Sequence, residues 1–117
     1  MSRILVVEDE AIVAMSLCLQ LSQAGHQPLP PAATGEKAIK LAMEHRPDAI
    51  LMDINLAHGM NGIEAGRTIR GFSEAPIIFT SGYTNEDIKR QALSLQPAEY
   101  LVKPLSFHRL MKLLAGL

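Results

Sequence analysis

The feature that most constrains the fold of this sequence is a regular alternation of short apolar runs with amphipathic stretches. The apolar runs are rich in branched side chains, and they cover residues 4–7, 49–52, 76–79 and 100–102. Each run is followed by a stretch with helical character, and a further extended segment covers residues 27–33. Strict alternation of this kind predicts a mostly parallel sheet with helices on both faces, joined by right-handed crossovers.

Capping residues define the expected helices. These helices cover residues 11–24, 35–45, 63–72, 86–95 and 107–117. Gly25 is expected to stop the first helix, because glycine readily adopts the left-handed conformation found at helix C-termini. Thr34 and Ser106 are expected to cap the second and fifth helices, and either Thr84 or Asn85 the fourth.

The extended segment at residues 27–33 differs from the other strands because it contains Pro28, Pro30 and Pro31. Proline has no N–H to donate to a ladder, so this strand is expected at an edge of the sheet. The expected fold is therefore a flavodoxin-like, doubly wound (βα)5 domain. Its five parallel strands have the order 2-1-3-4-5, which leaves the second strand at one edge.

Length and composition fit one domain, residues 1–117, and they limit its expected compartment and its expected classes of partner. The 11 basic and 12 acidic side chains nearly cancel, and no basic run indicates a nucleic-acid surface. The apolar runs are too short to span a bilayer. Cys18 is the single cysteine, which excludes an internal disulfide and suits a reducing compartment. The sequence therefore predicts a cytoplasmic domain without direct contacts to nucleic acid or membrane.

Polar side chains follow the apolar runs at the points where the strands end. Glu8 and Asp9 follow the first strand, Asp53 ends the third, Ser81 ends the fourth and Lys103 follows the fifth. Ligand sites in open parallel sheets lie beyond the carboxyl ends of the strands, where the strand order reverses. These five side chains are therefore expected to meet at one edge of the sheet.

Three carboxylates in one cleft require compensation, since two unit charges about 4 Å apart repel by roughly 4 kcal/mol at an effective dielectric constant near 20. Oxygen ligands without nitrogen or sulfur favour Mg²⁺ as the compensating ion. The same cleft can then hold a phosphoryl group, with charge taken up by the ammonium of Lys103 and the hydroxyl of Ser81. Asp53 is the best-placed nucleophile, because carboxylates form acyl phosphates.

With these residues in place, the sequence resembles the receiver domain of bacterial response regulators over essentially its whole length. The residues that carry the resemblance are 4–10 (ILVVEDE), 50–53 (ILMD), 79–83 (FTSGY) and 100–104 (YLVKP). Each motif is weak alone, but their order and spacing together are specific. The resemblance implies a two-component phosphoprotein that takes a phosphoryl group from a phosphohistidine donor and hydrolyses it slowly. Such a domain assists its own phosphorylation and dephosphorylation without being a conventional turnover enzyme.

The resemblance also implies roles for individual residues. Asp53 is the phosphoacceptor, and Lys103 contacts the phosphoryl group. Asp9 binds Mg²⁺ directly, Glu8 acts mainly through a metal-bound water, and the backbone carbonyl of Asn55 completes the protein's share of the ligands.

Further roles concern the conformational switch. The family spacing between the hydroxyl and the lysine selects Ser81, with Thr80 as the alternative. Tyr100 occupies the position of the switch aromatic, whose ring swings inward when the hydroxyl is drawn to the phosphoryl group. The bond before Pro104 is usually cis in this family, an isomer that proline makes accessible.

The loop after the phosphoacceptor departs from the common pattern. Residues 54–62 are one residue longer than in many receivers and contain no proline. Together with residues 79–83, this loop resembles a receiver subgroup with a Phe-Ala-Thr-Gly-type fourth strand. Tyr83, two residues beyond Ser81, is expected to cover the site and slow hydrolysis.

Expected partners follow from the first helix and from the resemblance. Ile12, Met15 and Leu19 form an apolar stripe that is expected to receive a histidine kinase or a histidine phosphotransfer protein. The alternative is that neighbouring segments cover this stripe. A downstream protein target is expected on the face formed by the fourth helix, the fifth strand and the fifth helix, and a second copy of the chain is a further candidate partner.

Other interpretations remain open at this level. Asp9 alone could be an N-cap of the first helix. A Mg²⁺-dependent phosphatase of the haloacid-dehalogenase type is less favoured, because it would need a carboxylate as general acid two residues after Asp53, where this sequence has Asn55. A flavin-binding module is disfavoured, because it would need a phosphate-binding loop after the first strand, where Glu8 and Asp9 would instead repel a phosphate. A receiver that no longer cycles and serves only as a binding module would keep the same fold.

Overall fold

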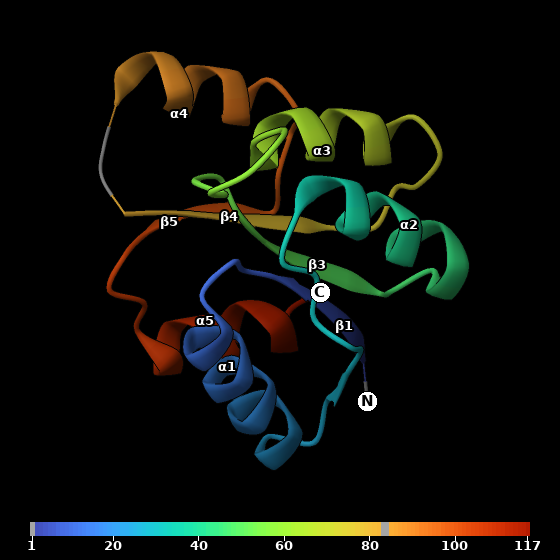
Figure 1. The fold of residues 1–117 in the computed structure, drawn as a ribbon. Helices are drawn as coiled ribbons and strands as arrows, with labels where there is room; N and C mark the ends of the chain where they lie inside the picture. The colour runs from blue at the N-terminus through green and yellow to red at the C-terminus, as the bar shows by residue number, and fades with distance from the viewer. Residues whose placement is uncertain (1, 83–84) are drawn as a thin grey trace.

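The strands form one parallel sheet in a computed structural model that describes residues 2–82 and 85–117. The strand order is β2-β1-β3-β4-β5, as the sequence predicts (Figure 1). The strands are β1 (Arg3–Val7), β2 (Gln27–Pro28), β3 (Ala49–Asp53), β4 (Ile77–Ser81) and β5 (Glu99–Val102).

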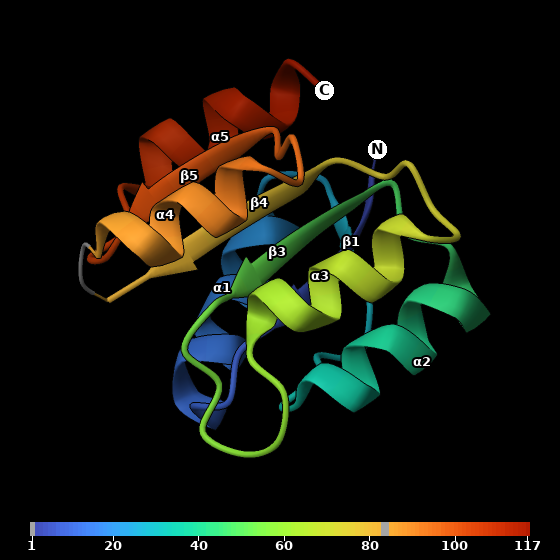
Figure 2. The same cartoon turned by 90° about the horizontal axis from the view of Figure 1, so that it is seen from above.

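Helices cover both faces of this sheet. They are α1 (Ala11–Gln23), α2 (Gly35–His45), α3 (Gly62–Arg70), α4 (Glu86–Leu93) and α5 (Phe107–Ala115). Helices α1 and α5 lie on one face, and α2, α3 and α4 lie on the other (Figures 1 and 2). Alternate side chains of the buried strands therefore enter two separate apolar clusters, one on each side of the sheet. None of the helices in the described part of the chain has the length and apolar character needed to cross a bilayer.

The edge strand β2 is shorter than the expected extended segment. Its ladder with β1 covers Gln27 and Pro28, and Ala32 forms an isolated bridge with Val7. Between these points the chain still runs beside β1, because the backbone N–H of Leu29 donates to the carbonyl of Ile4 at 2.9 Å. The intervening prolines have no N–H to donate, which explains why the ladder is interrupted at this edge.

The expected caps agree with the structure where they can be compared. The side chains of Thr34 and Ser106 each accept a hydrogen bond from the backbone N–H three residues further on. Asn85 caps α4 through the N–H groups two and three residues on, whereas Thr84 lies outside the described residues. Gly25 follows α1 with a φ of 92°, a conformation that favours glycine.

The sequence of α1 also predicts an inward apolar stripe of Val13, Leu17, Leu21 and Ala24, and the structure differs from it in part. Leu21 is fully buried, and Val13 and Leu17 are half-buried. The prediction for Ala24 is wrong, because the helix ends before this residue and leaves its side chain exposed. Ala14 is buried instead, so the packed face of α1 ends at Leu21 and includes Ala14.

Candidate functional site

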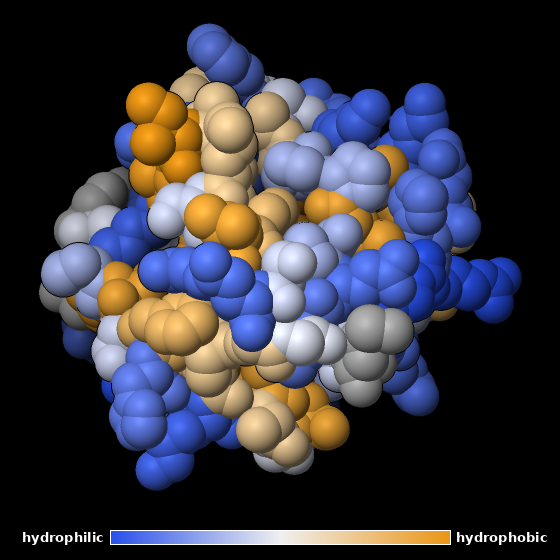
Figure 3. Space-filling view, turned by 90° about the horizontal axis from the view of Figure 1, so that it is seen from below, coloured by the Kyte–Doolittle hydropathy of each residue, from blue (hydrophilic) through white to orange (hydrophobic). Residues whose placement is uncertain are grey.

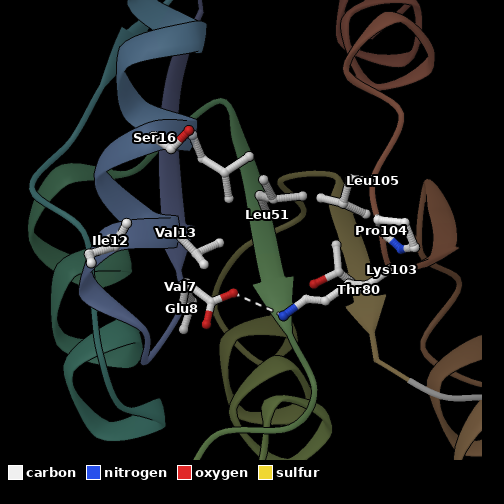
Figure 4. Close-up of a pocket in the computed structure, with 11 residues that line it drawn as sticks. Val7, Glu8, Ile12, Val13, Ser16, Leu51, Thr80, Lys103, Pro104 and Leu105 are labelled. Carbon is white, nitrogen blue, oxygen red and sulfur yellow. Dashed lines mark hydrogen bonds and ion pairs between the residues drawn. The ribbon is translucent and has the colours of Figure 1, made fainter.

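The carboxyl ends of β1, β3 and β5 bring an ion-paired cluster together. Lys103 Nζ lies 3.0 Å from Glu8 Oε1 and 3.1 Å from Asp53 Oδ2. Figure 4 shows the lysine reaching across the end of β3 toward Glu8. Both carboxylate residues are almost inaccessible, with 3% of Glu8 and 2% of Asp53 exposed. Parallel strand ends therefore place two buried negative charges around one ammonium group.

Asp9 adds a third carboxylate to this cluster. Glu8, Asp9 and Asp53 each offer one oxygen, and these three oxygens lie within 4.8 Å of one another. An oxygen-only set of this charge suits Mg²⁺, which prefers hard anionic ligands. One ammonium cannot neutralise three carboxylates, so the donor set fits a divalent cation.

The pKa values of Glu8 and Lys103 reflect this crowding. Burial raises the pKa of the Glu8 carboxyl above its ordinary value, and the negative charge of Asp53 raises it further. Hydrogen bonds from the backbone N–H of Glu10 and from Lys103 act in the opposite direction. Burial alone would lower the pKa of Lys103, but its hydrogen bonds and charge interactions with Glu8 and Asp53 outweigh burial and raise it. The lysine is therefore held in its charged form by the two carboxylates.

Backbone N–H groups fix the orientation of the acidic side chains. Asp9 Oδ2 accepts a hydrogen bond from the N–H of Ala57 at 3.0 Å, and Asp53 Oδ1 accepts one from the N–H of Asn55 at 2.9 Å. Asp9 is therefore tied to the loop after β3. The N-cap interpretation of Asp9 is wrong, since Glu10 occupies the N-cap position of α1 and makes no side-chain cap bond.

The end of β4 presents Ser81 to the loop after β3. Ser81 is fully buried, and its Oγ donates to Asn55 Oδ1 at 3.1 Å. The N–H of Gly82 donates to the same oxygen at 3.3 Å. Thr80, the alternative hydroxyl, instead lines a pocket beside α1. The resemblance implies a ligand role only for the backbone carbonyl of Asn55, because nothing in the local sequence indicates where its side chain points.

Tyr100 lies with its ring buried beneath α4. Only 8% of the residue is exposed, and Lys89 Nζ lies 5.9 Å from the centre of the ring. Its buried hydroxyl has no hydrogen-bond partner among the described residues. The bond between Lys103 and Pro104 is cis, which is the isomer that the resemblance implies. Tyr83 lies outside the described residues.

An apolar surface borders the cluster on the side of α1 and α5. Ile12, Met15 and Leu19 are 83%, 68% and 60% exposed, so the described residues leave this stripe uncovered. Figure 3, which views the molecule from below, shows apolar residues running across this face with hydrophilic residues on either side. A pocket of about 620 Å³ lies between α1 and the segment after β5, next to Lys103 (Figure 4).

Comparisons with known proteins agree with this fold. Residues 4–115 match the sequence profile described as the response regulator receiver domain. The transcriptional regulatory protein PdtaR of Mycobacterium tuberculosis is 33% identical over 109 residues, which are 93% of this chain and 53% of PdtaR. The regulatory protein KdpE of the same species is 36% identical over 104 residues, 89% of this chain and 45% of KdpE. This chain thus spans about half the length of these curated relatives.

Solved structures show the same arrangement of strands and helices. The signal receiver domain of a modulated diguanylate cyclase from Desulfovibrio desulfuricans superposes with a TM-score of 0.92 at 29% identity, covering 99% of this chain and 92% of that one. The chemotaxis protein CheY4 of Vibrio cholerae gives a TM-score of 0.88 at 27% identity, covering 99% and 98%. The fold is therefore that of the CheY-like receivers. The chain belongs to the response regulator receiver domain family of two-component systems.

Proposed function

We propose that this receiver accepts a phosphoryl group on Asp53 from a phosphohistidine donor. The observation that carries the proposal is the position of the Asp53 carboxylate. It is buried at the end of β3, hydrogen-bonded to Lys103, and within one cluster with Glu8 and Asp9. These carboxylates, with the backbone carbonyl of Asn55, would hold Mg²⁺. When bound, this ion supplies positive charge to the phosphoryl oxygens.

The chain's own groups divide the chemistry between them. An oxygen of Asp53 forms the new bond to phosphorus while the phosphorus–nitrogen bond of the donor breaks, and the electron pair of that bond stays on the imidazole nitrogen. Lys103, already 3.1 Å from Asp53 Oδ2, donates to the transferred group and offsets its charge. Water later hydrolyses the acyl phosphate slowly, so the domain acts as a signal carrier in the cytoplasm and not as a conventional enzyme.

The switch begins at Ser81 and Tyr100. The hydroxyl of Ser81 moves toward the phosphoryl group, and the Tyr100 ring is then favoured in its inward position. Tyr100 is 8% exposed, and its ring lies beside Lys89 of α4. We expect phosphorylation to shift the population of the ring between an inward and an outward position.

The output surface of this switch is the face formed by α4, β5 and α5. Leu93, Val102 and Phe107 are large apolar residues exposed on these three elements. We expect a downstream protein target to bind there, and a second copy of the chain is a further candidate for this face.

Metal dependence tests the proposed function. The protein is incubated with phosphoramidate in the presence of Mg²⁺ or of EDTA, and its intact mass is followed over time. We expect one phosphoryl group to be added with Mg²⁺ and none with EDTA, because the clustered carboxylates repel an anionic donor. A properly folded protein that gains no phosphoryl group under either condition would instead support the non-cycling interpretation.

The exposed stripe on α1 is proposed to receive the phosphodonor protein. Replacing Leu19 with glutamate should slow transfer from a cognate histidine kinase about tenfold or more, because a charge would be buried in an apolar interface. Phosphorylation by phosphoramidate should change less than about twofold, since the substitution lies outside the carboxylate cluster. Met43→Glu is the matched control, because Met43 is similarly exposed, at 57%, on the opposite face of the sheet. Equal slowing by both substitutions would contradict docking on α1.

A further inference from the structure

The side chain of Asn55 links the loop after β3, which follows the phosphoacceptor, to the end of β4, which carries Ser81. Its backbone N–H donates to Asp53 Oδ1 at 2.9 Å, so the residue is fixed beside the nucleophile. Its side-chain Oδ1 accepts hydrogen bonds from Ser81 Oγ and from the N–H of Gly82 at the end of β4. One residue therefore contacts both the phosphoacceptor and the hydroxyl that responds to it.

Asn55 Oδ1 and a phosphoryl oxygen on Asp53 would compete for the hydroxyl of Ser81. A hydroxyl has one hydrogen to donate. While Ser81 donates to Asn55 Oδ1, the same hydrogen is not available to a phosphoryl oxygen on Asp53. A charged phosphoryl oxygen is a stronger acceptor than a neutral carboxamide oxygen, by roughly a factor of two in hydrogen-bond strength. The hydroxyl should therefore stay with Asn55 in the resting state and move to the phosphoryl group after transfer.

We infer that Asn55 is a positioning residue that holds the Ser81 hydroxyl in its resting position and so sets the strength of phosphoryl binding required for switching. This inference rests on the proposed function of Asp53 as phosphoacceptor. The bond from the N–H of Gly82 has a different role, because its donor belongs to the backbone and does not need to move. It keeps the end of β4 joined to the loop after β3 while the hydroxyl changes acceptor.

A double-mutant cycle on the full chain tests the inference. The probe is beryllium fluoride, a stable mimic of the phosphoryl group, titrated at saturating Mg²⁺ and followed through backbone amide signals. Asn55→Ala should tighten beryllium fluoride binding about fivefold, which is roughly the net value of one neutral hydrogen bond. In the Ser81→Ala background, Asn55→Ala should change the beryllium fluoride affinity less than about 1.5-fold, because the hydroxyl for which Asn55 and the probe compete is absent.

Two controls separate this role from other effects of the substitution. The Mg²⁺ affinity of each variant is measured without beryllium fluoride, and each titration is run at a Mg²⁺ concentration that saturates that variant, so that a change in metal binding does not enter the comparison. The amide signal of Gly82 should shift in Asn55→Ala with or without the Ser81 hydroxyl, because this N–H loses its acceptor in both backgrounds.

The inference is overturned if Asn55→Ala changes beryllium fluoride affinity by the same factor in both backgrounds, or if it weakens binding or leaves it unchanged when Ser81 is present. The first result would assign Asn55 only an anchoring role for the loop. Failure of the unmodified protein to bind the probe, or binding that persists in Asp53→Asn, would overturn the proposed function itself and this inference with it. The two failures are therefore distinguishable.

Discussion

Replacing Lys103 with methionine is expected to destabilise the protein in EDTA by about 3 kcal/mol at neutral pH, because removing one partner of a buried ion pair leaves uncompensated charge. Here the lysine bridges two carboxylates, those of Glu8 and Asp53, both almost fully buried. Saturating Mg²⁺ should restore most of the lost stability, since a divalent cation compensates the same carboxylates. Urea unfolding in EDTA and in Mg²⁺ measures both effects.

The loss of stability caused by Lys103→Met in EDTA should depend on pH in a definite direction. Burial raises the pKa of Glu8, so this carboxyl takes up a proton at a higher pH than an ordinary glutamate does. Protonation removes one of the two charges that Lys103 would otherwise compensate. The destabilisation by Lys103→Met should therefore shrink as the pH is lowered from neutral through the raised pKa of Glu8.

The same substitution should slow phosphorylation by phosphoramidate about 10² to 10³-fold, as loss of one positioned electrostatic donor commonly does. Lys40→Met is the control, because Lys40 is exposed and pairs only loosely with Glu44, at 3.9 Å. An exposed pair of this kind should contribute less than about 0.5 kcal/mol. An equal effect of both substitutions on the free energy of unfolding in EDTA would show that the Lys103 ion pairs do not compensate a buried charge cluster.

Replacing Gly62 with alanine is expected to cost about 3 kcal/mol of stability, at the upper end for overpacking. A β-carbon at this position would overlap the backbone carbonyl oxygen of Asp53 and would lie 2.8 Å from the Cα of Ile54. These neighbours are backbone atoms at the end of β3, so they cannot rotate away as a flexible side chain could. Either α3 or the strand end that carries Asp53 must shift.

Function should suffer together with stability, because the displaced atoms include the backbone of the phosphoacceptor. Phosphorylation by phosphoramidate should slow at least about tenfold, even at temperatures where Gly62→Ala is folded. Gly116→Ala is the matched control, since the nearest atoms to its β-carbon would lie at an ordinary 3.7 Å. Urea unfolding and the phosphorylation rate of both variants check the prediction. Equal stabilities for the two variants would contradict the close approach of α3 to β3.

The sequence was sufficient to predict the fold because its determinants are local and mutually consistent. Buried parallel strands read as continuous apolar runs, and proline in the second segment placed it at the edge, where β2 is found. Thr34 and Ser106 cap their helices as their side-chain chemistry indicates. The meeting of Glu8, Asp9, Asp53 and Lys103 followed from topology, since the ends of parallel strands share one edge.

The remaining features depend on distances between segments, which no local pattern contains. The side chain of Asn55 contacts Ser81 only because the loop after β3 comes close to the end of β4. The position of Asp9 suggested a helix cap, yet its carboxylate accepts a hydrogen bond from the backbone N–H of Ala57, 48 residues away along the chain. For the stripe that includes Leu19, the sequence left exposure and coverage as alternatives, because the outcome depends on which segments pack beside α1.

The most direct test of the central claim is to compare the intact masses of the unmodified protein and Asp53→Asn after incubation with phosphoramidate and Mg²⁺. We expect the unmodified protein to gain one phosphoryl group and Asp53→Asn to gain none, while both keep the same fold by circular dichroism. If Asp53→Asn acquires a phosphoryl group at the rate of the unmodified protein, the buried carboxylate at the end of β3 is not the phosphoacceptor.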